Sequence, residues 1–143
     1  MRHDLIASNS VKINASPDKV WHALTDPETI KEYLFGTNTV TDWKEGSEII
    51  FKGEYQGHHY ADHGQILENK PLEKLSYSYW SGFSGLDDRP ENYSTITYLL
   101  SKLDQNTTEL TWTQKGYPDE SRHAHALKDM PEFLGRIKGI IER

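Results

Sequence analysis

The sequence predicts an α+β fold in which a curved antiparallel sheet of about seven strands wraps a long C-terminal helix. Three observations predict it: an amphipathic helical pattern over residues 118–143, a change to period-two alternation after Gly36, and two cap-and-proline pairs near the N-terminus. Because consecutive strands joined by short turns pair antiparallel, the strands should form a meander. The apolar side of the helix must then be buried against that sheet.

The N-terminal segment is expected to form one strand followed by two short helices. Residues 3–13 alternate weakly and predict the first strand. Ser16-Pro17 and Asp26-Pro27 each place a good N-cap before a proline, which is the arrangement typical of a helix start. Two short helices between the first and second strands are placed to close one end of the sheet.

The middle of the chain predicts a run of strands. Polar and glycine-containing turns separate them, and residues 81–92, with two glycines, a proline and three acids, form the longest predicted loop. A slip of one residue in any register would exchange the inward and outward faces of a strand. The predicted strands are residues 47–55, 59–68, 75–80, 93–103 and 109–115.

The last helix is the element around which the sheet is organised. Its apolar residues recur at helical spacing, and charged residues occupy the other side. Pro131 removes a backbone donor and is expected to kink or restart the helix. The predicted inward residues are Ala124, Leu127, Met130, Leu134, Ile137 and Ile141.

Length and composition exclude several classes of function. A chain of 143 residues is expected to be a single domain spanning 1–143. The formal net charge of -6 and the absence of a basic run disfavour nucleic-acid binding, and zero cysteines exclude disulfides, thiolate catalysis and cysteine-ligated zinc. No segment is apolar enough to span a membrane. We therefore expect a cytoplasmic protein, either a monomer or a dimer, that needs no cofactor.

Five strings of the sequence are distinctive: INASPDKVW at 13–21, ALTDP at 23–27, DHGQILE at 62–68, KLSYSYW at 74–80 and TELTWTQ at 108–114. They resemble the activator-of-Hsp90-ATPase-homologue-like branch of the START/Bet v 1 superfamily of polyketide cyclases, dehydrases and lipid-transport proteins. The resemblance implies a helix-grip fold with a ligand cavity between the sheet and the C-terminal helix. It implies no single reaction, because the superfamily contains carriers, sensors, cyclases and co-chaperone domains. Co-chaperone members carry an additional N-terminal domain, whereas this chain begins almost directly at its first strand.

Aromatic residues on the predicted strands form the strongest candidate site. Alternation can place them on one concave face, where tyrosine hydroxyls need partners that a ligand would supply. Two residues of the C-terminal helix are expected to form the opposite wall. The predicted ligand-binding residues are Phe51, Tyr60, Tyr77, Tyr79, Tyr98, Trp112, Met130 and Leu134.

Other candidate sites are weaker. His59 and His63 would be about 13 Å apart at strand rise, too far to share one metal ion, and surface histidines are the preferred interpretation. Gly82-Phe83-Ser84-Gly85 lacks the spacing of a nucleophile elbow. The loop acids Asp87, Asp88 and Glu91 are expected to be solvated. Asp62 and Glu54, which lie on strands, would merit attention as acid–base groups if buried.

Three hypotheses about function follow. The leading one is a protein that binds a small hydrophobic or aromatic molecule between the sheet and the helix, with no defined reaction. The second is a protein-interaction module related to Hsp90 co-chaperone domains, with Hsp90 as a candidate partner. The third is a cyclase- or hydrolase-like enzyme in the same cavity, which would require a buried acid or histidine within reach of the aromatic residues.

Overall fold

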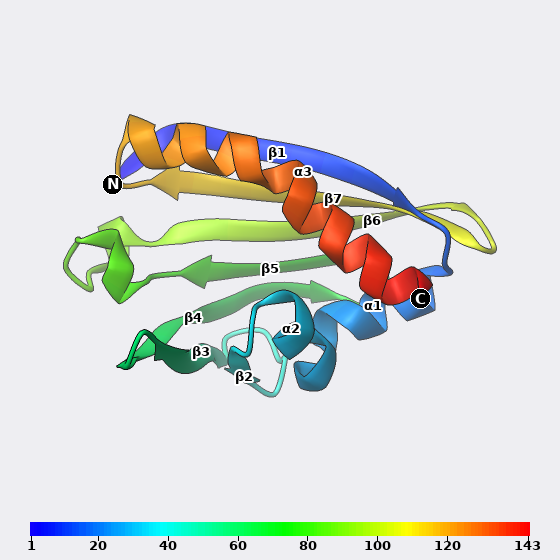
Figure 1. Cartoon of the computed structure of the whole chain (residues 1–143), viewed down its shortest axis with the longest axis horizontal. Coiled ribbons are helices and arrows are strands. Elements are labelled where there is room, and N and C mark those ends of the chain that lie inside the picture. The colour runs from blue at the N-terminus through cyan, green and yellow to red at the C-terminus, as the bar shows by residue number, and fades with distance from the viewer.

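A computed structural model describes residues 1–143 and contains one seven-stranded antiparallel sheet with a long helix across it (Figure 1). The strand order is β1-β7-β6-β5-β4-β3-β2, so every strand except β1 lies beside its neighbour in sequence. The curved sheet wraps the C-terminal helix α3, and the short helices α1 and α2 lie at one end (Figure 1). The predicted α+β helix-grip fold is confirmed.

The observed elements agree with the predicted order and add one strand that the sequence pattern did not predict. That strand, β2, has only three residues, which is too short for alternation to show. The elements are β1 (Arg2–Ile13), α1 (Pro17–Thr25), α2 (Pro27–Tyr33), β2 (Asn38–Val40), β3 (Glu48–Tyr55), β4 (His58–Lys70), β5 (Lys74–Tyr79), η1 (Gly82–Ser84), η2 (Pro90–Asn92), β6 (Ser94–Asp104), β7 (Thr107–Tyr117) and α3 (Glu120–Glu142).

The two short helices begin where the caps predict. The Ser16 hydroxyl accepts a hydrogen bond from the Lys19 backbone N–H at 3.4 Å. The Asp26 carboxylate accepts from the Thr29 backbone N–H at 3.3 Å and from its hydroxyl at 2.7 Å. Each cap satisfies a helix-end donor that otherwise has no partner inside the helix. The second cap also lets α2 follow α1 with a single residue between them.

Helix α3 runs through Pro131 without a break, and its axis changes direction near its middle in Figure 1. Met130, Leu134 and Ile137 are buried, as predicted. The prediction fails in the first half of the helix, where Ala124 is exposed and Leu127 is 47% exposed. The first half of α3 contacts the sheet through residues other than Ala124 and Leu127. The bend expected at a proline changes the direction of the helix axis between its two halves, so one straight apolar stripe does not describe both.

The loop between β5 and β6 is anchored to the convex side of the sheet. His63 Nε2 lies 2.8 Å from Asp88 Oδ2 and 3.0 Å from the Tyr93 hydroxyl, and the Tyr93 hydroxyl donates to Asp88. The His63 ring also packs on Trp80 at 5.3 Å between centroids. Asp88 is exposed, as predicted for the loop acids, but it is held by hydrogen bonds, and His63 is partly buried, with 27% of its side chain exposed.

This anchor should weaken in acid. The hydrogen bond from Tyr93, followed by the contact with His63, lowers the pKa of Asp88. Because the folded-state pKa lies below the unfolded value of about 4, the anchor is at full strength above that pH and is lost as pH falls through the folded-state pKa. An NMR titration should show His63 and Tyr93 signals changing together at acid pH. The same step persisting in Asp88→Asn would contradict the assignment.

Candidate ligand-binding cavity

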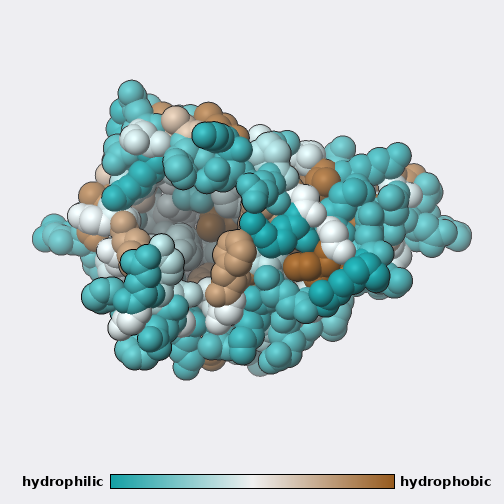
Figure 2. All heavy atoms as spheres, viewed as in Figure 1, coloured by the Kyte–Doolittle hydropathy of each residue, from teal (hydrophilic) through white to brown (hydrophobic).

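A cavity of about 360 Å³ lies between the concave face of the sheet and α3. Figure 2 shows this face of the molecule hollowed, with a mostly hydrophilic rim and less polar atoms inside. Strands β3 to β7 supply the floor, α3 supplies one wall, and the segment between α2 and β2 supplies part of the rim. The volume falls within the range of pockets that hold small organic ligands.

Strand register explains why the aromatic residues converge. Phe51 pairs with Asp62 between β3 and β4, and Tyr98 pairs with Trp112 between β6 and β7. Directly paired residues share a face of the sheet, so each pair presents both side chains to the same side. Seven of the eight sequence-predicted residues line the cavity: Phe51, Tyr60, Tyr77, Tyr79, Tyr98, Trp112 and Met130.

Leu134 lies elsewhere. It is 1% exposed and belongs to the hydrophobic core. Its neighbour Phe133 lines the cavity instead, and its ring packs edge-on against Trp112 with 5.8 Å between centroids. The wall that α3 supplies therefore contains Met130, as predicted, and Phe133 in place of Leu134.

Further residues line the cavity that are not among the eight predicted ligand-binding residues. Phe35, which follows α2 with a positive φ of 51°, is 77% exposed at the rim, and the Arg136 guanidinium lies 4.2 Å from its ring centre. An exposed aromatic residue after a helix end carries no periodic signal, so sequence patterns do not reveal it. The other lining residues are Leu34, Thr37, Asp62, Ile96, Gln114, Ala126 and Asp129.

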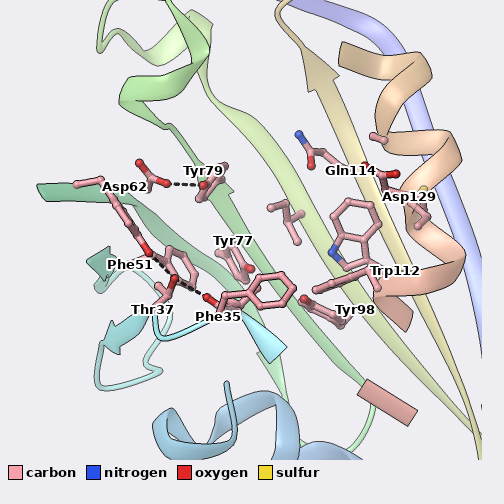
Figure 3. A pocket seen from close by; sticks show the side chains of 16 residues that line it. Phe35, Thr37, Phe51, Asp62, Tyr77, Tyr79, Tyr98, Trp112, Gln114 and Asp129 are labelled. Carbon is pink, nitrogen blue, oxygen red and sulfur yellow. Dashed lines mark hydrogen bonds between the residues drawn. The ribbon is translucent and has the colours of Figure 1, made fainter. Parts of the chain in front are cut away.

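Two of the four tyrosine hydroxyls in the cavity have partners within the protein. The Tyr60 hydroxyl lies 2.6 Å from the Thr37 hydroxyl, and Tyr79 donates to Asp62 Oδ2 at 2.7 Å (Figure 3). Burial raises the pKa of Tyr77, Tyr79 and Tyr98, so these phenols remain protonated at neutral pH. Their side chains therefore give the cavity neutral, amphipathic walls.

Asp62 is the one buried acid of the cavity. Its residue surface is 7% exposed, whereas Glu54, the other strand acid singled out in the sequence, is exposed. Its Oδ2 accepts the Tyr79 hydrogen bond, and its buried Oδ1 has no hydrogen-bond partner. A buried polar atom without a partner is uncommon in folded proteins and carries a free-energy cost. This carboxyl group gives the otherwise apolar cavity a defined polar point.

No helix is both long and apolar enough to cross a membrane.

The solution structure of ChR145 from Cytophaga hutchinsonii is 42% identical to this chain, with 99% of this chain and 97% of that chain covered and a TM-score of 0.84. The crystal structure of MLL2253 from Mesorhizobium loti is 21% identical, with 96% and 97% covered and a TM-score of 0.77.

A further similar structure is the Aha1 dimer from Colwellia psychrerythraea, at 19% identity, with 96% of each chain covered and a TM-score of 0.73. Comparison with curated proteins gives no match. The model of the Activator of Hsp90 ATPase homolog 1-like protein family matches residues 14–142, which is most of the sequence. The chain therefore belongs to the Activator of Hsp90 ATPase homolog 1-like family.

Proposed function

We propose that this protein binds a small hydrophobic or aromatic molecule in the cavity between the sheet and α3. The observation that carries the proposal is the cavity lining, in which 12 of 16 residues are hydrophobic. Burying apolar ligand surface there would stabilise the complex by about 25 cal/mol per Å² before the costs of association are subtracted.

The aromatic walls favour a flat ligand. Phe51 packs against Tyr77 and Tyr79, with centroid separations of 5.5 and 5.8 Å. Trp112 and Phe133 form a second aromatic pair on the opposite side. Rings held by neighbouring rings lose little conformational entropy when a ligand binds, and their faces and edges suit stacking with another ring.

Binding is the hypothesis that the geometry supports best. The hydroxyls of Tyr60 and Tyr79 are already paired, so ligand contacts with the walls would be mainly apolar. Asp62 supplies the buried acid that the enzyme alternative requires, but its partner Tyr79 has a raised pKa and holds its proton. The Hsp90-interaction alternative is supported by the family description alone.

Filling the cavity should weaken binding. Ala126 lines the cavity and Ala124 is exposed on the same helix, so Ala126→Trp and Ala124→Trp form a matched pair. We expect Ala126→Trp to lower the affinity for N-phenyl-1-naphthylamine, a neutral fluorescent aromatic probe, by about tenfold or more, because the indole occupies the ligand volume. Ala124→Trp should bind like the wild type.

Fluorescence titration measures the affinity for the probe, and native mass spectrometry before and after denaturation and refolding reports any co-purified molecule. A bound mass of a few hundred daltons that is lost on refolding and absent from Ala126→Trp would support the proposal. Equal probe affinity in the two tryptophan variants would refute a site in this cavity.

A further inference from the structure

The residues that line the cavity include acids but no bases. The two acids are Asp62 and Asp129, and the lining contains no lysine, arginine or histidine. The Asp129 side chain is 58% exposed and lies 3.2 Å from His125, so solvent and a neighbouring base already surround it. Asp62 is buried, and the protein provides no basic side chain within hydrogen-bond distance of its carboxylate.

Asp62 has used only part of its capacity to accept hydrogen bonds. Tyr79 donates to Oδ2, which leaves Oδ1 buried and without a partner. An ionised carboxylate accepts several hydrogen bonds, and burying one without a compensating charge is costly. A donor brought by the ligand would satisfy Oδ1, and a positively charged donor would also balance the charge.

The neighbouring residues favour a cationic donor over a neutral one. The Asp62 carboxyl group lies beside Tyr79, and its strand partner is Phe51 (Figure 3). The faces of aromatic rings attract cations, most strongly where water is excluded. A neutral hydroxyl would also donate to the carboxylate, but it would gain neither the attraction of the ring faces for a cation nor the attraction between two opposite charges.

We propose that the ligand is a small arylalkylamine, that is, an aromatic ring carrying an amine on an aliphatic chain. Its protonated nitrogen donates to Asp62 while its ring packs against the aromatic walls. This inference rests on the proposed function, because it names the chemical class that the same cavity would bind. The formal charge of -6 on the chain would also favour the approach of a cation.

Three indole probes of similar shape test the inference. Tryptamine carries a protonated amine at neutral pH, tryptophol carries a neutral hydroxyl at the same position, and 3-ethylindole carries neither. We expect the wild type to bind tryptamine more tightly than the other two by about tenfold or more at pH 7, measured by calorimetry, because only the ammonium adds the attraction between opposite charges to the hydrogen bond.

Asp62→Asn keeps the shape of the side chain and an oxygen for Tyr79 but removes the charge. We expect it to weaken tryptamine binding by about 10- to 100-fold and to leave the affinity for 3-ethylindole nearly unchanged. The control is Asp87→Asn, which changes the net charge equally at a loop side chain that is 84% exposed. The control should retain the wild-type preference for tryptamine.

The outcomes separate this inference from the proposed function. If tryptophol or 3-ethylindole binds the wild type as tightly as tryptamine does, the amine assignment is overturned while the cavity remains a binding site. If none of the three probes binds while N-phenyl-1-naphthylamine does, the amine assignment fails and the proposed function stands; if N-phenyl-1-naphthylamine does not bind either, both proposals fail. The comparison among probes uses the wild type alone, so it remains decisive even if Asp62→Asn does not fold.

Discussion

Replacing Leu134 with alanine should lower the free energy of unfolding by about 2–5 kcal/mol, since it removes a fully enclosed side chain and leaves a void. Leu134 is 1% exposed and packs in the core beneath α3. The surrounding residues come from a sheet and a helix that are already fixed by other contacts, so the void can collapse only in part. Urea denaturation followed by circular dichroism measures the loss.

Leu127 provides the matched control for this substitution. It is the same residue type on the same helix, but it is 47% exposed. Leu127→Ala should change stability by no more than about 0.5 kcal/mol, as is usual for surface positions. Equal losses for the two variants would show that the helix is rotated relative to the sheet from the orientation described above.

Gly64→Ala should destabilise the fold by about 3 kcal/mol, because a β-carbon cannot be accommodated there. Such an atom would lie 1.7 Å from the Ser78 carbonyl oxygen and 2.4 Å from its carbonyl carbon. Both are backbone atoms of β5, which cannot rotate away as the end of a side chain can. Glycine in a strand interior often marks such a close approach between backbones. Chemical denaturation of the purified variant measures the effect.

Gly135→Ala is the control for Gly64→Ala. Gly135 lies in α3, and a β-carbon there would meet nothing within 4 Å. Because alanine favours the helical state over glycine, this variant should gain about 0.5–1 kcal/mol. The two glycine-to-alanine changes should therefore move stability in opposite directions, and a loss at both positions would contradict the steric explanation.

The sequence predicted those parts of the fold in which local chemistry and tertiary structure agree. Ser16 and Asp26 start helices through contacts with residues three positions later, so short-range patterns suffice. Alternation also placed Phe51, Tyr77 and Tyr98 correctly, because a strand has only two faces and the more apolar one turns inward.

The sequence did not predict features that depend on how distant elements meet. Leu127 is more apolar than His123, yet His123 is the less exposed of the two because its ring packs against Tyr117 and lies 2.9 Å from the Ile6 carbonyl oxygen. The sequence pattern shows that Asp62 is an acid on a strand. That its Oδ1 is buried without a hydrogen-bond partner depends on how β3, β4 and β5 pack, which the pattern does not show. Helical phase and buried polar geometry are properties of the packed structure.

The place of β1 in the sheet has a consequence for how the protein is made. Its only strand partner is β7, with Ile13 opposite Thr108, so β1 cannot pair until β7, the last strand of the sheet in sequence, has been synthesised. The strands between them can pair with sequence neighbours during translation, whereas β1 cannot. Contacts between such distant segments slow folding. The newly synthesised chain therefore passes through a period in which its first strand is unpaired and accessible to chaperones.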